Sequence, residues 1–246
     1  MGESVACLRF DKDLWFFLAS RNRQASVQVA CDGTSTVGHL VEALGVPLTE
    51  VGSLVADGRP VAPSYQPVGG VVEVRPVARP QRLPLAPPRF LLDVHLGALA
   101  RRLRLVGVDS AYSNDAGDDE LVVAANEQNR VLLTQDRGLL RRRSLRLGGY
   151  VRGARPDHQL RDVLERFAPP LAPWTICTAC NGRLSAVPKS QVEQVLQPGT
   201  RRTYDSFARC LACGQVYWRG AHSRRLEAVV AAAAAAVAAA RGDPGR

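Results

Sequence analysis

Two pairs of cysteines near the C-terminal end are the residues whose spacing most clearly indicates chemistry. Cys177 and Cys180 form one Cys-x-x-Cys pair, and Cys210 and Cys213 form another, with 29 residues between the pairs. The glycines that follow each pair supply the backbone freedom that such tight turns need. Four thiolates complete the tetrahedral shell of a structural zinc ion and leave no open position for catalysis. The spacing therefore predicts a four-cysteine zinc ribbon, with redox-active thiols as the alternative, although one pair would suffice for that chemistry.

A second set of candidate residues consists of acids that follow short apolar stretches. Asp93 ends the stretch FLLD, and Asp136 ends the stretch VLLTQD. The segment between them contains four more acids in a loop and a helix start: Asp115, Asp118, Asp119 and Glu120. Grouped carboxylates repel one another unless a cation is present, and such oxygen ligands suit Mg²⁺ or Mn²⁺. Because these ions activate water and neutralise charge that develops at phosphorus, the acids predict a site for phosphoryl chemistry.

The same acids have a plain structural explanation. Aspartate is a preferred N-cap, and each of these acids precedes a predicted helix. The pattern alone leaves capping and metal binding equally open, whereas the repetition of acids after consecutive strands favours the metal site. Other acids are expected to be structural. Asp109 is expected in a turn, and Asp157 and Asp162 are expected on a solvated helix face. The alternative for either Asp157 or Asp162 is a role as a fourth active-site acid.

Positive charge is concentrated in the later part of the chain and is almost entirely arginine. The net charge is +9, and only Lys12 and Lys189 are lysines. Residues 1–79 carry 7 basic and 8 acidic side chains, so the other 25 basic and 15 acidic side chains give the remainder +10. Arginine favours flat, bidentate contact with phosphates. We therefore predict that the arginines beside the acids bind a phosphate backbone: Arg101, Arg102, Arg104, Arg137, Arg141, Arg142 and Arg143.

The elements expected around the acids alternate between strands and helices. Strands are predicted at 90–93, 108–115 and 131–136, with one more at 148–153, and helices at 94–107, 118–130, 137–143 and 157–167. Such alternation indicates an α/β fold with a mostly parallel, doubly wound sheet, whose active site lies at the carboxyl ends of the strands. The acids that follow the three strands are therefore expected to converge at one edge of the sheet.

The N-terminal part has a different order of elements. Strands are predicted at 4–10 and 25–33, a helix at 34–47, and further strands at 53–61 and 69–77, with a turn at Asp57–Gly58. Two strands, a helix and more strands are the order of a β-grasp fold. Five prolines in residues 76–89 then indicate an extended linker.

Several classes of protein are disfavoured by what the sequence lacks. No phosphate loop of the form G-x-x-x-x-G-K-[ST] occurs. The N-terminus has no basic-then-apolar order typical of a secretory signal. The alanine-rich stretch 229–240 is too short to span about 30 Å of hydrocarbon. We therefore predict a cytoplasmic protein whose cysteines bind metal or stay free, with Cys7 and Cys31 in the β-grasp core.

Three stretches resemble the Mut-seven C-terminal RNase-domain family, which is regarded as a branch of the PIN-like nuclease fold. They are FLLDVHLGALARRLRLVGVD, DDELVVAANEQNRVLLTQDRGLLRR and QLRDVLERF, and the likeness continues through CNGRL and YWRGAH. The N-terminal part resembles the ubiquitin-like domains that precede such RNase domains. Its Gly69–Gly70 pair is internal, which does not fit conjugation or sulfur transfer, so the resemblance implies an accessory domain for packing or for a protein partner.

The resemblance also implies roles for the acids. Asp93 matches the acid that ends the first PIN strand, and Asp118 or Asp119 matches the acidic pair that opens the next helix. Asp136 matches the acid of the T-x-D strand end, and Thr134 is then expected to orient its carboxylate. PIN nucleases commonly offer one more acid after the following strand, where GGYVRGARPD provides one only several residues late.

The predicted organisation has five parts. They are a ubiquitin-like domain at 1–78, a proline-rich linker at 79–88, a PIN-like RNase domain at 89–170, a zinc ribbon at 171–225 and a frayed alanine-rich tail at 226–246. In the ribbon, Tyr217 and Trp218 are expected to pack the fold, with base stacking as the alternative. His222 is expected to be structural or to contact RNA.

These expectations combine into a predicted metal-dependent ribonuclease. Asp93, Asp119 and Asp136 would bind Mg²⁺ or Mn²⁺, with Asp118 as the alternative to Asp119, and water would attack the phosphodiester. The arginines would hold the RNA, and the ribbon would extend the binding surface. The alternative is a non-catalytic RNA-binding or adaptor protein that uses the ribbon and the ubiquitin-like domain as contact surfaces, which an acidic site without its fourth acid would fit.

Overall fold

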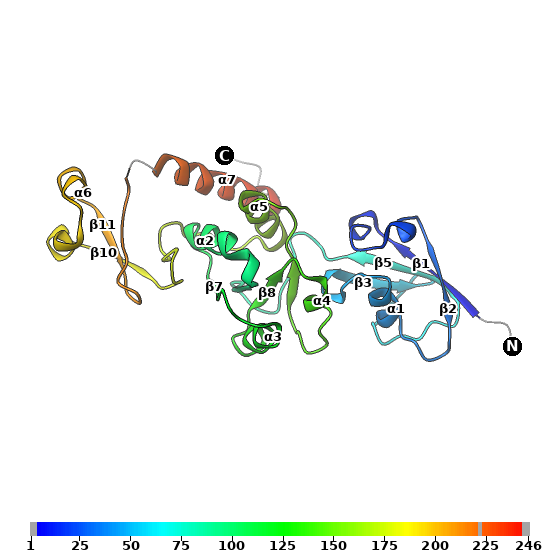
Figure 1. The fold of residues 1–246 in the computed structure, drawn as a ribbon. Coiled ribbons are helices and arrows are strands. Elements are labelled where there is room, and N and C mark those ends of the chain that lie inside the picture. Colours follow the sequence, from blue (N-terminus) through cyan, green and yellow to red (C-terminus); the bar gives the residue numbers. More distant parts are fainter. Residues whose placement is uncertain (1–3, 221–222, 243–246) are drawn as a thin grey trace. The chain divides into compact units, whose positions relative to one another are not determined.

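A computed structural model describes residues 4–220 and 223–242 of the chain. It divides into two compact units, each drawn in Figure 1. The first unit consists of residues 1–78 together with 134–150, and the second consists of residues 79–133 together with 151–246. His222 and the last four residues, for which the sequence carries predictions, lie outside the described ranges.

The first unit is built on a mixed five-stranded sheet. Its strands are β1 (Ser4–Phe10), β2 (Val27–Cys31), β3 (Val51–Ala56), β4 (Arg59–Val61) and β5 (Gly70–Pro76), in the order β2-β1-β5-β3-β4. The central pair, β1 and β5, is parallel, and the other pairs are antiparallel. Helix α1 (Val37–Ala43) contributes Val37 and Val41 to the core. This arrangement confirms the predicted β-grasp fold.

Local chemistry sets the ends of these elements. The Thr36 hydroxyl caps α1 by accepting a hydrogen bond of 3.3 Å from the amide of His39. Strands β3 and β4 are joined by Asp57 and Gly58, whose φ angles of 45° and 81° are both positive, as a two-residue hairpin turn requires. The predicted turn is therefore present.

Residues 134–150 fold with the β-grasp core in this first unit. They contain the short helix α4 (Arg137–Leu140) and strand β9 (Gly148–Tyr150). The ring of Tyr150 lies 5.3 Å from the rings of both Phe16 and Phe17. Its amide donates a 2.8 Å hydrogen bond to the carboxylate of Glu50, which is only 3% exposed. Aromatic packing and a buried hydrogen bond therefore hold this segment.

The second unit contains three parallel strands, in the order β7 (Ser110–Tyr112), β6 (Phe90–Leu92) and β8 (Val131–Thr134). Every residue of β6 and β8 is buried. Helices α2 (Gly97–Leu105) and α5 (Pro156–Phe167) lie above these strands in Figure 1, and α3 (Asp118–Glu127) lies below them. The predicted α/β fold with a parallel sheet is confirmed, and its strands are shorter than predicted.

Helix α5 binds residues from other segments of the chain. Asp162 is 9% exposed, pairs with Arg79 at 2.8 Å and accepts a 2.8 Å hydrogen bond from the amide of Arg152. The expectation that Asp162 is solvated is therefore wrong, because this face of α5 is covered. The amide of Gln81 donates to the carbonyl of Arg166, so the segment that enters the second unit is bonded to α5.

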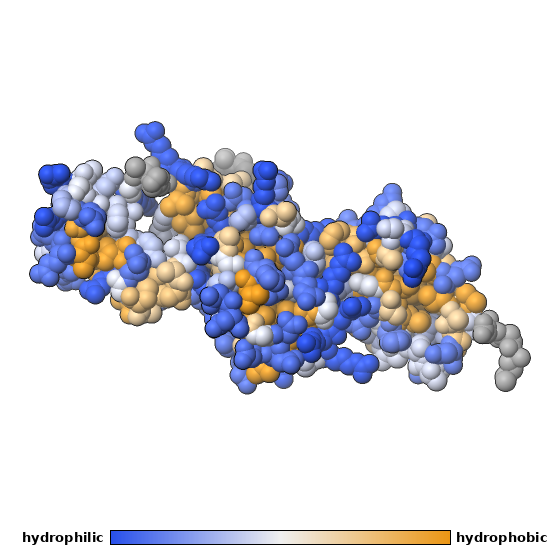
Figure 2. Space-filling view, in the orientation of Figure 1, coloured by the Kyte–Doolittle hydropathy of each residue, from blue (hydrophilic) through white to orange (hydrophobic). Residues whose placement is uncertain are grey.

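The cysteine-containing part forms a small antiparallel sheet, which we call the ribbon (residues 174–220). Its strands are β10 (Leu184–Val187), β11 (Phe207–Cys210) and β12 (Val216–Trp218). Helix α6 (Pro198–Thr203) lies in the connection between β10 and β11, and Val192, Leu196 and Phe207 form a small core. The visible face of this part carries apolar residues among hydrophilic ones (Figure 2).

The alanine-rich tail forms a long helix, α7 (Ser223–Arg241), that packs against α5. It buries Ala233 and Val237, and Arg241 donates a 2.7 Å hydrogen bond to the carbonyl of Ala168. The predicted frayed tail is therefore a docked helix. Among the described helices, none combines the length and apolar character that crossing a membrane requires.

Candidate functional site

The four ribbon cysteines lie together as their spacing predicts. Their sulfur atoms are all within 4.8 Å of one another, with 3.7 Å between Cys177 and Cys213 and 3.5 Å between Cys180 and Cys210. Zinc–sulfur bonds of about 2.3 Å in a tetrahedron place sulfurs about 3.8 Å apart. A disulfide needs about 2.05 Å, and all six cysteines are free. The donor set therefore fits one tetrahedral zinc ion.

Two similar backbone turns position these cysteines. The amide of Asn181 donates to the carbonyl of Cys177, and the amide of Gly214 donates to the carbonyl of Cys210, each at 3.0 Å. A Cβ atom on Gly182 would come within 2.8 Å of the Cys210 sulfur. Glycine is therefore required there by the close approach of the sulfur.

Burial and hydrogen bonds affect the thiols unequally. Burial raises the pKa of Cys180, and hydrogen bonds with the other thiols raise it further, to about 12. Burial also acts on Cys210, but the amides of Cys213 and Ala212 outweigh it and lower its pKa to about 6. In the absence of a cation, one thiol therefore keeps its proton while another ionises. Bound zinc would take the place of that proton.

Arg104 fastens the first turn of the ribbon to the rest of the second unit. This side chain is 3% exposed. Its Nη1 donates hydrogen bonds to the carbonyls of Ala179 (2.8 Å) and Thr178 (3.2 Å), and its Nε donates to the carbonyl of Ser110 (2.8 Å). The buried guanidinium of Arg104 therefore binds backbone carbonyls of the protein, whereas the sequence predicted that it contacts phosphate.

Asn181 makes a second link between the same parts. Its Nδ2 donates to Asp109 at 2.7 Å, and its Oδ1 accepts from the amide of Ser110 at 2.8 Å. Asp109 also pairs with Arg130 at 2.7 Å. The pKa of Asp109 is lowered because the hydrogen bonds from Arg130 and Asn181 outweigh the burial that would raise it. Asp109 is therefore a structural ion-pair residue.

We use the term strand-end acids for Asp93, Asp118, Asp119 and Asp136. Asp93 directly follows β6 and is 6% exposed. Its amide donates to the carbonyl of Leu133 in β8, and its Oδ1 accepts a 2.6 Å hydrogen bond from the amide of Val94. The carboxylate is thus held at the carboxyl end of the central parallel strand.

The acidic pair after β7 occupies the start of a helix. Asp118 and Asp119 are the first two residues of α3, and both are exposed. Glu120 accepts a 3.0 Å hydrogen bond from the amide of Gly117, which caps the helix. Carboxylates are stabilised at this end of a helix by its dipole, so their position has a local structural reason.

Asp136 is the N-cap of α4. Its Oδ1 accepts from the amides of Gly138 (2.6 Å) and Leu139 (3.4 Å). The hydroxyl of Thr134, which is fully buried, accepts from the amide of Asp136 at 2.8 Å. Thr134 therefore fixes the turn through the backbone. Its predicted action on the carboxylate stays a prediction.

The strand-end acids differ from the cysteines in how closely they are gathered. Across residues 4–220 and 223–242, the four cysteines are the one group of three or more Cys, His, Asp or Glu side chains close enough to hold an ion. Asp136 belongs to the first unit, and the other strand-end acids belong to the second. Their role as Mg²⁺ or Mn²⁺ ligands stays a prediction.

The predicted phosphate-binding arginines fall into two groups. Arg137 donates from Nη1 and Nη2 to the carbonyls of Phe17 and Phe16, each at 3.0 Å, and its guanidinium lies 4.7 Å from the Phe16 ring centre. Arg141 donates a 3.3 Å hydrogen bond to the carbonyl of Glu42. Both therefore bind the β-grasp part of their unit, contacts between distant stretches that sequence patterns did not reveal.

Apart from the buried Arg104, the other predicted arginines are partly or fully exposed. Arg102 pairs through Nε with Asp157 at 2.9 Å, so this predicted solvated acid has a partner. Arg101, Arg142 and Arg143 are exposed. Burial does not prevent these side chains from contacting phosphates, and such contact stays a prediction.

These features define a protein with a β-grasp part, a parallel α/β part and a four-cysteine ribbon. The family model described as the Mut7-C RNAse domain matches residues 88–230, and the model described as Mut7-C ubiquitin matches residues 3–82. The first match alone covers more than half of the chain, so the protein belongs to the Mut7-C RNAse-domain family and carries an N-terminal Mut7-C ubiquitin-like domain. The resemblance predicted from the sequence is confirmed. No curated protein and no solved structure matches the chain significantly.

Proposed function

We propose that this protein is a metal-dependent ribonuclease whose active site is formed by the strand-end acids. The observation that carries the proposal is the position of these acids after successive strands. Asp93 directly follows β6, Asp118 and Asp119 open the helix after β7, and Asp136 caps the helix after β8. In open α/β sheets, ligands bind outside the carboxyl ends of the strands. The Mut7-C RNAse-domain match supports RNA as the substrate class.

The residues fit a hard cation by type and by environment. A Mg²⁺ or Mn²⁺ ion held by Asp93, Asp119 and Asp136 would activate a water and neutralise charge on the phosphodiester. Asp93 is 6% exposed, and a carboxylate with so little contact with water is stabilised by a nearby cation. Asp136 uses Oδ1 for the helix cap, which leaves Oδ2 to bind a ligand. Asp118 is the alternative to Asp119.

The exposed arginines would bind the RNA backbone. Arg101, Arg142 and Arg143 are exposed and Arg102 is partly exposed, and their positive charge would attract phosphates. Arg137 and Arg141 also carry the phosphate prediction, but their hydrogen bonds to the β-grasp part favour an anchoring role. The ribbon would hold a structural zinc ion, and the ubiquitin-like domain would serve packing or a protein partner.

The test is the substitution Asp136→Asn, assayed on labelled single-stranded RNA with added Mn²⁺ or Mg²⁺. Asparagine keeps an Oδ1 acceptor for the helix cap, so the protein should fold normally, but it removes the charge and replaces Oδ2 with an amide nitrogen that cannot bind a cation. We expect activity to fall by about 100-fold or more. Loss of a residue that only hydrogen-bonds to a metal ligand costs about 10- to 100-fold, and loss of a direct ligand should cost at least the upper end of that range. Chelators are avoided, because they would also strip zinc from the ribbon.

The matched control is Asp205→Asn in the ribbon, whose side chain is 86% exposed, and this variant should cleave like the wild type. A wild-type protein that cuts no RNA with either ion, or an Asp136→Asn variant that cuts as fast, would contradict the proposal.

A second candidate function is RNA binding without cleavage. It is favoured by one observation on the described residues: the cysteines are gathered closely enough for an ion, whereas the strand-end acids are not. Tight RNA binding by a wild-type protein that leaves the strand intact with both Mn²⁺ and Mg²⁺ would establish it.

A further inference from the structure

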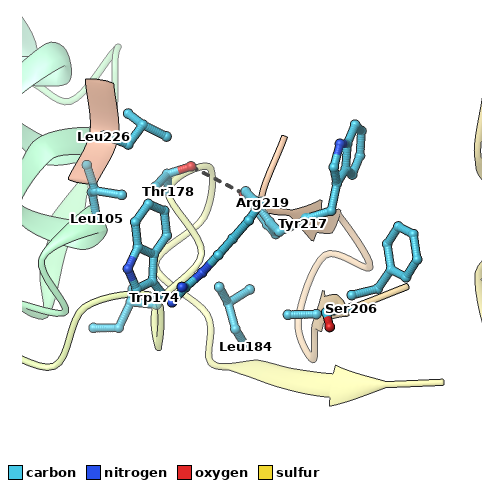
Figure 3. A pocket seen from close by; sticks show the side chains of 12 residues that line it. Leu105, Trp174, Thr178, Leu184, Ser206, Tyr217, Arg219 and Leu226 are labelled. Carbon is cyan, nitrogen blue, oxygen red and sulfur yellow. Dashed lines mark hydrogen bonds between the residues drawn. The ribbon is translucent and has the colours of Figure 1, made fainter. Parts of the chain in front are cut away.

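A cavity of about 280 Å³ lies in the second unit, at the junction of the ribbon, α2 and α7 (Figure 3). Its lining includes the aromatic side chains of Trp174, Tyr217 and Trp218, together with Arg219. Figure 3 shows the Arg219 side chain reaching from the ribbon toward Trp174, and its guanidinium carbon lies 5.5 Å from that ring centre. An arginine among flat aromatic rings is the usual composition of a site that stacks bases.

We propose that this cavity binds one unpaired base of a single-stranded RNA. The inference rests on the proposed function in that RNA is the ligand, but it does not depend on cleavage. It gives Trp218 a reason to be 42% exposed, since a ribbon residue needed only for packing would be covered. It also decides between the two roles that the sequence left open for Tyr217 and Trp218.

The size of the cavity favours a base over a protein segment. Ligand sites usually measure about 300–1,000 Å³, so this cavity lies at the lower limit and its volume suits a small ligand such as one base. A helix or strand of a partner protein would need a long groove for several side chains.

The backbone of Trp174 and the side chain of Tyr217 are held in place before any ligand arrives. Trp174 has a φ of 65°, a left-handed conformation that bulky residues rarely adopt, and its amide is bonded to the carbonyl of Leu105 at 3.2 Å. The Tyr217 hydroxyl is hydrogen-bonded to the Cys177 sulfur at 3.0 Å and to Thr178 at 3.3 Å. These hydrogen bonds hold the polar end of Tyr217 against the metal-site turn, and its ring lines the cavity. A pre-positioned ring loses little conformational freedom when a base stacks on it.

Positive charge adjoins the aromatic cavity on one side. A second cavity of about 350 Å³ shares Leu105, Thr178 and Leu226 with the first and is lined by Arg101 and Arg102. A base in the aromatic cavity would therefore have its neighbouring phosphates beside arginine side chains. This combination of stacking surface and positive charge suits a nucleic acid strand and does not suit an apolar peptide.

The experiment measures binding of a fluorescently labelled single-stranded RNA to the full chain carrying Asp136→Asn, without chelator. Trp218→Leu keeps apolar bulk against Phe207 but removes the stacking surface, and it should weaken binding by about 5- to 100-fold. Trp218→Phe restores a ring and should bind within about threefold of the parent. The matched control is Leu211→Ala, because Leu211 is 71% exposed on the same ribbon and does not line the cavity.

Further measurements separate stacking from a structural role. Zinc content and melting temperature should be unchanged in Trp218→Leu. RNA that contains 5-iodouracil should crosslink to the peptide that holds Tyr217 and Trp218. Arg219→Gln, which leaves both rings in place, should weaken binding and reduce its salt dependence, whereas the exposed Arg59→Gln should not.

The outcomes distinguish this inference from the proposed function. Wild-type cleavage of RNA combined with unchanged binding by Trp218→Leu and Arg219→Gln would overturn the base site and leave the nuclease in place. Weakened binding and crosslinks at the cavity in a protein that never cleaves would support the base site and overturn the nuclease. Crosslinks confined to other segments would also overturn the base site.

Discussion

The ribbon cysteines and the strand-end acids are two candidate metal sites built in opposite ways. Each cysteine pair lies on one tight turn, the two turns make the same hydrogen bond, and all four sulfurs lie within 4.8 Å of one another. The acids follow three different strands, and Asp136 belongs to the first compact unit while Asp93 belongs to the second. A site made from local turns is complete once those turns form, whereas a site made from strand ends depends on the whole fold.

The largest expected effect comes from breaking the cysteine site. Cys210→Ser removes a ligand that is 2% exposed, so the zinc content should fall from about one ion per chain to none, and the ribbon should lose its structure. Elemental analysis and thermal unfolding would measure this. Cys31→Ser, at a half-buried cysteine outside the ribbon, should retain the metal. A folded, metal-free wild-type ribbon would contradict the zinc assignment.

The next effect concerns the link between the ribbon and the body of the second unit. Arg104→Met should lower the free energy of unfolding by about 2–3 kcal/mol, because three carbonyls lose a charged donor. Its matched control is Arg101→Met, one turn earlier and exposed, which should change stability by no more than about 0.5 kcal/mol.

RNA binding should show the reverse order, with the Arg101 variant weakened and the Arg104 variant close to the wild type at temperatures where it is folded. Equal stabilities for the two variants, measured by denaturant unfolding, would show that the Arg104 contacts contribute nothing.

A smaller effect is the pH dependence of zinc binding. The pKa of Cys180 is raised to about 12, so this thiol is protonated at neutral pH and must lose its proton when zinc binds. Cys210, with a pKa of about 6, is already ionised above that pH. Zinc affinity should therefore rise as pH rises, by at least about tenfold per unit between pH 7 and 8 for one released proton. Competition with a chromophoric chelator measures this, and a flat profile would count against the assignment.

The smallest effect separates the two roles of Asp136. Asp136→Ala should cost about 1 kcal/mol of stability because the helix cap is lost, whereas Asp136→Asn should cost only a few tenths. Both variants should lose RNA cleavage alike. Loss of cleavage in the alanine variant alone would make Asp136 a cap without a role as a ligand.

The correct and the incorrect predictions differ in how far apart in the sequence the contacting residues lie. The cysteine site, the β-grasp fold, the Asp57–Gly58 turn and the parallel sheet follow from spacing and periodicity within short stretches. The buried Asp162 and the docked helix α7 were missed, because each depends on what packs against α5 from distant stretches. Composition alone presented the polyalanine tail as a frayed helix, since alanine gives no clear apolar face.

The arginines illustrate the same limit within a single helix. Arg101, Arg102 and Arg104 are equivalent in the sequence, yet the first is exposed, the second pairs with Asp157, and the third is buried beneath the ribbon. Arg101 and Arg104 are three residues apart and lie on nearly the same side of the helix, so helical periodicity alone does not separate the exposed side chain from the buried one. Which face is covered depends on where the ribbon lies, and no pattern within the helix records that.

By itself, the sequence determined the types of ligand that this protein can offer: four thiolates on two turns, and carboxylates after successive strands. Turn geometry and strand period act over a few residues, so short patterns specify them. Only the tertiary structure decided that the thiols meet at tetrahedral distances, that Arg104 and Arg137 bind protein carbonyls, and that Arg219 shares one cavity with aromatic rings from separate segments. Those outcomes depend on contacts between residues far apart in the chain, which packing of the whole fold selects.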